Sequence, residues 1–303
     1  MLRQAVESYI ALKRAVGFSF ERAGDALRSF ARFASERGEA HVITQTAIDW
    51  AGLASSVRER DIRLKYVIRF SQHARAEDPR HEIPPGDVYC YQRRRPVPFI
   101  FTPSEIQRLV KAASRLGPKG SLRPHTYSTL FALLASTGLR ISEALALRLN
   151  DVTPDGLIIR ETKFRKTRLV PLHETAVAGF ERYLARRRRL RGRDDHVLVD
   201  QHAHGLQYLA VKRTFRALVQ SADIDHGTGQ PIPQLHSLRH TFAVRALESC
   251  PHRRDYVGRH LLALSTYLGH ASVKSTYWYL EATPELMTDI AAAYDLFVKG
   301  EAT

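Results

Sequence analysis

A proline-rich stretch between residues 79 and 98 constrains the fold of this 303-residue chain more than any other feature. Proline lacks a backbone N–H and fixes φ, so no regular helix can run through this stretch. It therefore predicts a boundary between a small domain over residues 1–88, a basic linker over 89–98 and a second domain from residue 99. The residues of this stretch that interrupt helices are Pro79, Pro84, Pro85, Gly86, Pro96 and Pro98. Its consecutive basic residues are Arg93, Arg94 and Arg95.

Apolar residues before the boundary recur at helical spacing. Leu2, Val6, Tyr9 and Ile10 fall on one face of a first helix, which Gly17 ends. Three further helices are expected, the third of the domain starting near residues 44–46. The arginines between the apolar stripes either face water or meet phosphates, and in so basic a chain we expect some phosphate contacts.

Charge and cysteine content narrow the class of protein. Lys and Arg number 46 against 31 Asp and Glu, a formal charge of +15, which predicts a polyanionic partner. Charge alone does not separate DNA from RNA or from an acidic membrane. No apolar run is long enough to span a bilayer, and Cys90 and Cys250 form neither a disulfide framework nor a zinc motif. We therefore expect a cytoplasmic protein without a membrane partner.

The second domain is expected to be mostly helical with a small antiparallel β-sheet. Thr102, Pro103 and Glu105 predict a capped helix start. Two short strands are expected over 157–159 and 169–171, with residues 163–166 as their turn, and another over 196–199. Helices are expected over 174–191, 207–221, 236–249, 258–268 and 272–281, and a last amphipathic helix and tail over 284–303.

Basic and phenolic residues with related chemistry are spread over this domain. A phosphodiester resists attack because its oxygens are anionic and its leaving alkoxide is poor. An enzyme without a metal must place positive charge around the phosphorane, supply a nucleophile and protonate the departing oxygen. Arginine forks bind phosphate oxygens, and a tyrosine forms an ester that conserves the energy of the broken bond. Residues able to do this are Arg140, Lys163, His236, Arg239, His270 and Tyr279.

Four motifs carry these residues in one order. They are Thr137-Gly138-Leu139-Arg140-Ile141-Ser142-Glu143, the hairpin Lys163-Phe164-Arg165-Lys166-Thr167-Arg168-Leu169-Val170-Pro171, His236-Ser237-Leu238-Arg239-His240, and Leu268-Gly269-His270 with Tyr279 nine residues later. Together they resemble the active site of the tyrosine recombinases, the phage-integrase family of DNA strand-exchange enzymes. The residues around Tyr279 resemble members carried by transposable elements. The resemblance implies a two-domain C-shaped DNA clamp, with a SAM-like core-binding domain over 1–88 and a catalytic domain over 99–283.

The resemblance also implies a role for each residue. Arg140 and Arg239 would clamp the phosphate, and Glu143 would orient the arginine and histidine. In the family the first hairpin lysine, here Lys163, protonates the leaving 5′ hydroxyl, although position alone does not distinguish it from Lys166. His236 would accept the tyrosine proton or hold the phosphate, and His270 would bond a non-bridging oxygen. Tyr279 would be the nucleophile, because in the family the nucleophile lies nine residues after the second histidine, as Tyr279 does after His270. Tyr277 has the same chemistry but would point about 200° away on a helix.

The implied function is site-specific recombination through a 3′-phosphotyrosyl intermediate and a Holliday junction, in integration, excision or transposition. Expected partners are double-stranded DNA with a core site and three further protomers in a tetramer on two sites. Sister recombinases and an accessory DNA-bending protein are further candidates, and the enzyme would be nucleoid-associated. The tail over 284–303 would contact a neighbouring protomer. Expected DNA contacts outside the catalytic set are Arg93, Arg94, Arg95, Arg165 and Lys166.

No cofactor or metal is expected. His236 and His240 are four residues apart and could share a metal on one helix face, but the glutamate of a zincin motif is replaced by Ser237. Two other functions remain open on the same residues. A type IB topoisomerase-like enzyme would relax supercoiled DNA without a specific site, and a DNA-binding regulator would act without Tyr279.

Overall fold

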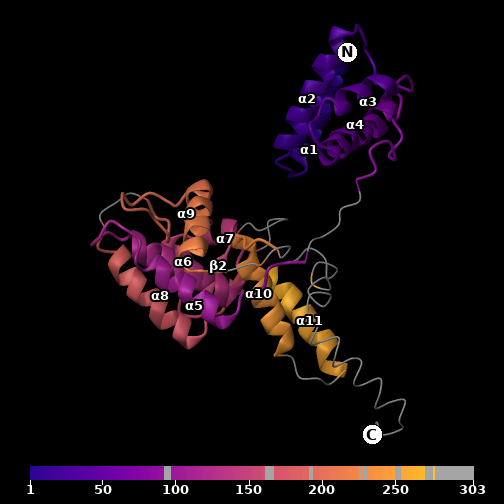
Figure 1. Cartoon of the computed structure of the whole chain (residues 1–303). Helices are drawn as coiled ribbons and strands as arrows, with labels where there is room; N and C mark the ends of the chain where they lie inside the picture. The colour runs from indigo at the N-terminus through magenta and orange to yellow at the C-terminus, as the bar shows by residue number, and fades with distance from the viewer. Residues whose placement is uncertain are drawn as a thin grey trace, which may run out of the picture. The chain divides into compact units, whose positions relative to one another are not determined.

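The computed structural model describes residues 1–91, 97–160, 167–190, 194–224, 227, 231–249, 254–269 and 276. The chain divides into two compact units, Met1–Arg95 and Pro96–Thr303. Both are built mainly of helices, and a three-stranded antiparallel sheet lies in the second (Figure 1). The predicted fold class, mostly helical with a small antiparallel sheet, is thereby confirmed. Within the described ranges, no helix has both the length and the apolar character needed to cross a bilayer.

The first unit is a bundle around one apolar core. Phe30 and Phe70 are fully buried at its centre, and Trp50 packs edge-on against Phe30 with ring centroids 5.5 Å apart. The side chain of Ser56 caps the longest helix by accepting a hydrogen bond from the backbone of Glu59 at 3.2 Å. The helices of this unit are α1 (Leu2–Ala15), α2 (Glu21–Glu36), α3 (Thr44–Gly52) and α4 (Val57–Glu77).

The second unit is organised around the apolar helix α6 (Arg123–Thr137), which contacts helices on several sides. It lies between α5 (Pro103–Ala113) and α8 (Glu174–Arg187), and α10 (Leu235–Glu248) also packs on it (Figure 1). The predicted capping box of α5 is present, because Thr102 and Glu105 bond each other's backbone N–H groups. The remaining helices are α7 (Ile141–Ala146), the 3₁₀ turn η1 (Leu149–Asp151), α9 (Tyr208–Ser221) and α11 (Arg254–Leu268).

The sheet contains the predicted hairpin and one strand that the sequence did not reveal. Strand β2 (Gly156–Ile159) pairs antiparallel with β3 (Arg168–Val170), and the extra strand β1 (Val152–Thr153) pairs with β2. Two residues are too few to produce a recognisable alternation. The predicted strand over 196–199 is wrong, since His196 and Val199 form only isolated bridges, to Arg148 and Gly205.

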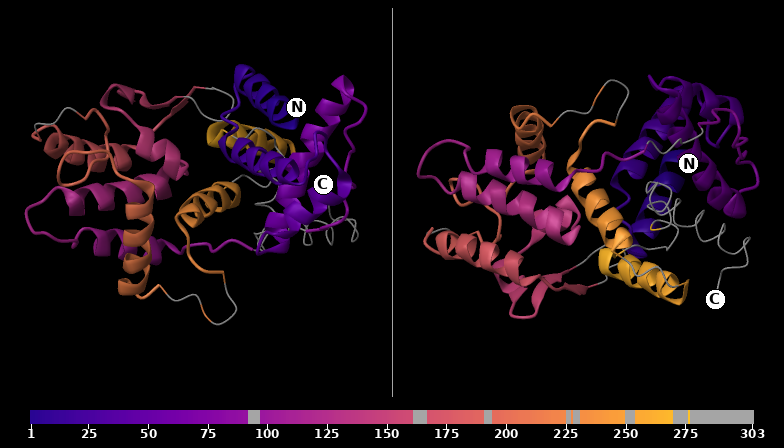
Figure 2. Two further views of the ribbon diagram at one scale, coloured as in Figure 1. Left: turned by 90° about the horizontal axis from the view of Figure 1, so that it is seen from above. Right: turned by 60° about the horizontal axis from the view of Figure 1, so that its bottom comes forward.

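Helices α10 and α11 contact each other on the side of the second unit away from α8 (Figures 1 and 2). The apolar part of their contact includes Val244, Leu264 and Leu268. It brings the last turn of α11 beside the junction between α6 and α7. The predicted helix over 272–281 and the tail over 284–303 lie outside the described residues, apart from Thr276.

Candidate active site

Arg140 is placed by the sharp end of α6. Gly138 terminates that helix in the left-handed conformation, with φ of 60°, and a Cβ there would lie 2.4 Å from Cδ1 of Phe242. The chain therefore turns tightly, and Arg140 becomes the residue that precedes α7. Its side chain is 29% exposed, so solvent reaches the guanidinium.

Glu143, in the first turn of α7, holds Arg140 from two directions. Its carboxylate accepts hydrogen bonds from the backbone N of Arg140 at 3.0 Å and from Nη1 of the same residue at 2.7 Å. The predicted contact between Glu143 and Arg140 is therefore present. A negative side chain in a first helical turn is also favoured by the helix dipole.

Glu143 binds a second guanidinium, that of Arg168 at the start of β3. Nη1 and Nη2 of Arg168 donate to the two carboxylate oxygens at 3.1 and 2.8 Å. Burial opposes ionisation of Glu143, but hydrogen bonds from Arg168 and Arg140 outweigh it and hold the pKa of Glu143 below its usual value. Glu143 is therefore a carboxylate shared between two arginines.

Arg239 is buried beneath the same turn. It is 2% exposed, and it donates to the carbonyl oxygens of Gly138 and Leu268, each at 2.7 Å. Because Gly138 ends α6 and Leu268 ends α11, this one side chain joins two helix ends. Helix C-terminal carbonyls carry partial negative charge and lack intrahelical partners, which suits a buried guanidinium.

Three consecutive carbonyls at the end of α11 each accept a hydrogen bond from a different arginine. Tyr267 accepts from Nε of Arg168 at 2.8 Å, Leu268 accepts from Arg239, and Gly269 accepts from Nη2 of Arg140 at 2.9 Å. These arginines come from β3, α10 and the α6–α7 junction. The end of α11 thus gathers positive charge from three elements at one point.

His236 lies in the first turn of α10, three residues before Arg239. Its side chain is exposed, yet desolvation by the surrounding protein, together with the charges of Arg239 and Arg140, lowers its pKa to about 4. Its ring meets that of His240 edge-on, with centroids 4.5 Å apart. His236 is therefore neutral at pH 7 and keeps a lone pair that can accept a proton.

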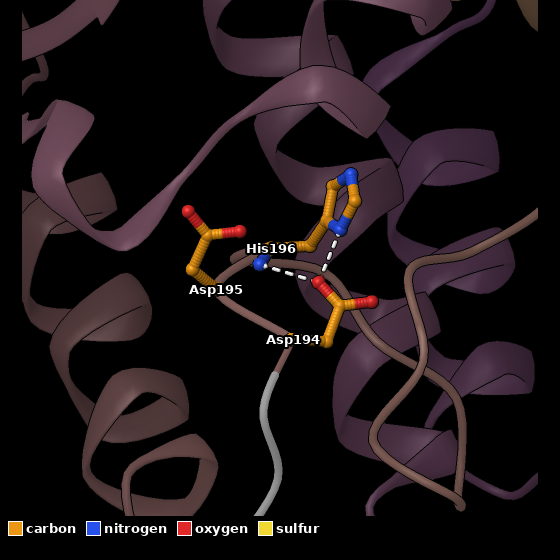
Figure 3. A group of neighbouring side chains, drawn as sticks. All are labelled: Asp194, Asp195 and His196. Atoms are coloured by element: carbon orange, nitrogen blue, oxygen red, sulfur yellow. Dashed lines mark hydrogen bonds and ion pairs between the residues drawn. The ribbon is translucent and has the colours of Figure 1, made fainter.

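The possible metal-ligand group in the described parts of the chain lies elsewhere. Asp194, Asp195 and His196 come close together, and Figure 3 shows the Asp194 carboxylate bonded to the backbone N and Nδ1 of His196. Arg148 forms ion pairs with both aspartates, and Gly205 N donates to Asp194 at 2.7 Å. These oxygens are thus engaged in joining loop segments, which favours a structural role.

The remaining predicted site residues lie outside the described residues. β2 and β3 define the hairpin strands on either side of the predicted turn, and Gly269 is the last described residue before His270. The structure therefore brings together Arg140, Glu143, Arg239 and His236 only. The predicted site residues that lie outside the described ranges are Lys163, His270, Tyr279, Arg165, Lys166, Arg93, Arg94 and Arg95.

Arg168 is the member of this cluster to which sequence reasoning assigned no role. It stands in the lysine hairpin motif, five residues after Lys163. The motif itself was the available signal, because its pattern includes an arginine at that place. Its partners in the fold, a carboxylate and a carbonyl, cannot be read from the hairpin.

Comparison with known proteins agrees with this geometry. The Phage integrase family model matches residues 100–285. A Sinorhizobium fredii protein provisionally named integrase/recombinase y4rB is 37% identical over 95% of both chains. Tyrosine recombinase XerD of Caulobacter vibrioides is 30% identical, over 79% of this chain and 75% of its own.

Solved structures share the fold at lower identity. The Tn1549 transposon integrase in complex with transposon right end DNA superposes with a TM-score of 0.66 at 16% identity, covering 96% of this chain and 98% of its own. A lambda integrase dimer bound to a core site gives a TM-score of 0.62 at 16% identity, over 90% and 96%. On the family match and the identity to full-length relatives, the chain belongs to the phage integrase family of tyrosine recombinases.

Proposed function

We propose that this tyrosine recombinase cuts and rejoins double-stranded DNA at specific sites, with Arg140 and Arg239 stabilising the attacked phosphate and Tyr279 as the nucleophile. The observation that carries the proposal is the convergence of Arg140 and Arg239 at the end of α11, with His236 close enough to both for their charges to help lower its pKa. The next residue after that end is His270, and Tyr279 follows nine residues later. The order of the chain thus supports one common site.

The two arginines would interact with the phosphate in different ways. Arg140 is partly exposed and has N–H groups beyond the two in its side-chain bonds, so a phosphate oxygen can reach it. Arg239 is buried and would contribute fixed positive charge from inside the domain, without reaching solvent. Preorganised charge of this kind stabilises a phosphorane because no reorganisation is needed as negative charge develops.

The proton transfers would run through the histidine and a lysine. Neutral His236 would accept the proton from the phenol of Tyr279 as its oxygen bonds to phosphorus and the 5′ oxygen departs. Lys163, or Lys166 in its place, would protonate that 5′ oxygen, and His270 would bond a non-bridging oxygen. The product is a 3′-phosphotyrosyl link, and attack by a 5′ hydroxyl reverses the step without ATP.

The partner is double-stranded DNA. The charge of +15 supports it, and the related Tn1549 and lambda integrases were solved with DNA. The finer proposals are a tetramer on two core sites, with a Holliday junction between the two exchanges, the tail over 284–303 joining protomers, and action at the nucleoid in the cytoplasm. The basic residues 93–95, with Arg165 and Lys166, would contact the DNA backbone.

Covalent trapping tests this proposal. Wild type and Tyr279→Phe are incubated, with no divalent metal, with nicked duplexes from the ends of the element that encodes the protein. We expect a denaturation-resistant adduct with wild type only. An adduct with neither protein, despite tight binding, would contradict the proposal and favour a regulator. Relaxation of supercoiled plasmids that lack these ends would instead favour a topoisomerase-like enzyme.

A further inference from the structure

Arg168 makes three side-chain hydrogen bonds that join the hairpin to two other elements. Nη1 and Nη2 donate to the two oxygens of Glu143 in α7, at 3.1 and 2.8 Å, and Nε donates to the carbonyl of Tyr267 in α11 at 2.8 Å. The side chain is only 12% exposed. A planar fork with donors on two sides can make this set of contacts, whereas a lysine ammonium cannot reproduce it.

Glu143 transmits this constraint to Arg140. The oxygen that accepts from Nη1 of Arg168 also accepts from Nη1 of Arg140, and the other oxygen also accepts from the Arg140 backbone. Arg140 in turn donates to the Gly269 carbonyl. Arg168, Glu143, Arg140 and the end of α11 thus form a closed ring of contacts. The orientation of the Arg140 guanidinium depends on each member.

The charges in this ring also matter. Glu143 alone beside Arg140 would form a neutral pair and weaken the attraction of Arg140 for a phosphate. With Arg168 the group has two guanidiniums and one carboxylate, so one positive charge remains. Because Arg140 is the more exposed arginine, at 29% against 12%, a phosphate can reach this charge through Arg140.

Gly269 provides the space in which Arg168 lies. Its φ is +65°, and a Cβ at this position would be 2.8 Å from Nη1 of Arg168. The glycine also directly precedes His270 in the sequence. Arg168 itself directly follows the hairpin segment that contains Lys163 and pairs with Ile159 of β2. One guanidinium therefore joins the hairpin to the helix end that leads into the histidine motif.

We propose that Arg168 is a positioning residue for strand cleavage, which orients Arg140 through Glu143 and keeps the carboxylate from neutralising it. This inference rests on the proposed cleavage function. It predicts that Arg168→Lys slows formation of the phosphotyrosyl adduct by roughly ten- to a hundredfold. The loss is smaller than the roughly 10²–10³ expected for removing a direct donor, because Arg168 acts through another group. DNA affinity should stay within about twofold.

The experiment measures single-turnover adduct formation by the full chain on nicked duplexes, with DNA affinity measured in parallel. Arg160→Lys is the matched control, because Arg160 lies at the other side of the same hairpin, is 58% exposed and pairs with Asp151. It should cleave like wild type. If Arg168→Lys does not fold, Arg168→Gln, which keeps an amide donor, is measured in its place.

A mutant cycle separates positioning from a purely structural role. If Arg168 acts through Arg140, the double variant Arg140→Lys/Arg168→Lys should be no slower than Arg140→Lys alone. Two results would overturn the inference. The Arg168 variant could cleave at the wild-type rate, or the rate loss of the double variant could equal the product of the two single losses. Every experiment includes the wild type, which must form the adduct if the proposed function is correct. A wild type that forms no adduct would therefore contradict the proposed function and not the role of Arg168.

Discussion

The guanidinium of Arg239 lies 2.7 Å from the carbonyl oxygen of Leu268, a contact that joins α10 to the last turn of α11 across 29 residues of sequence. The same side chain donates to Gly138, so a single buried arginine joins α10 to two helix ends. The positive charge of the site is therefore built into the packing of the second unit. Changes that disturb these helix ends should affect stability and chemistry together.

Arg239→Lys should damage both properties. A lysine cannot bridge two carbonyls in the same plane, and a buried polar group left without a partner costs about 1–3 kcal/mol. We expect that loss of unfolding free energy in urea, and cleavage slowed about 10²–10³-fold as for other preorganised donors. Arg245→Lys is the control, because Arg245 lies on the same helix, is 50% exposed and pairs with Glu248. An Arg239→Lys variant that cleaves like this control would contradict the role given to Arg239.

Gly138→Ala should destabilise the second unit. An alanine in the left-handed conformation costs about 1–2 kcal/mol, and its Cβ would also overlap Phe242, so we expect at least about 2 kcal/mol. Gly258→Ala is the matched comparison, because Gly258 lies inside α11 and, apart from its own helix backbone, no atom of the described residues lies within 4 Å of its Cβ position. There alanine should stabilise by up to about 1 kcal/mol. Equal effects of the two changes on urea unfolding would refute the explanation.

The lowered pKa of His236 predicts a specific dependence of stability on pH. Its folded value, about 4, lies below its ordinary value of 6.5, so the unfolded state takes up the proton first as pH falls. His236 should therefore contribute a loss of stability between about pH 6.5 and 4 and none above. His236→Asn should lose less stability than wild type between pH 7 and 5 in urea unfolding. An identical loss in both proteins would show that His236 has an ordinary pKa when folded.

A modified substrate should distinguish the two hairpin lysines. Sulfur in place of the departing 5′ oxygen gives a much better leaving group, which needs no proton from a general acid. If Lys163 is that acid, Lys163→Ala should cleave the normal phosphodiester at least about 10²-fold more slowly and the sulfur analogue at the wild-type rate. Lys166→Ala should cleave both nearly normally. The reverse pattern would assign the role to Lys166.

The sequence predicted those features that depend on local chemistry. The capping box of α5 and the β2–β3 hairpin follow from neighbouring residue types. A contact of Glu143 with Arg140 was expected from the family resemblance, and the two residues lie three positions apart at the start of α7. These features need no knowledge of distant packing.

What could not be predicted depends on tertiary contacts. Arg168 and Arg239 bind carbonyls of Tyr267, Leu268 and Gly138, and every residue type carries a carbonyl. No residue pattern marks such acceptors before the helix ends are brought together. The expected strand over 196–199 failed for a related reason, because its apolar residues are buried in the core of the second unit while its backbone forms only isolated bridges.

The residue that becomes covalently joined to DNA identifies the nucleophile. The adduct formed by wild type is digested with nuclease and protease, and the peptide that retains a nucleotide is sequenced by mass spectrometry. We expect the nucleotide on Tyr279, linked through a 3′ phosphate. A nucleotide on Tyr277 or on any other residue, or a 5′ linkage, would contradict it.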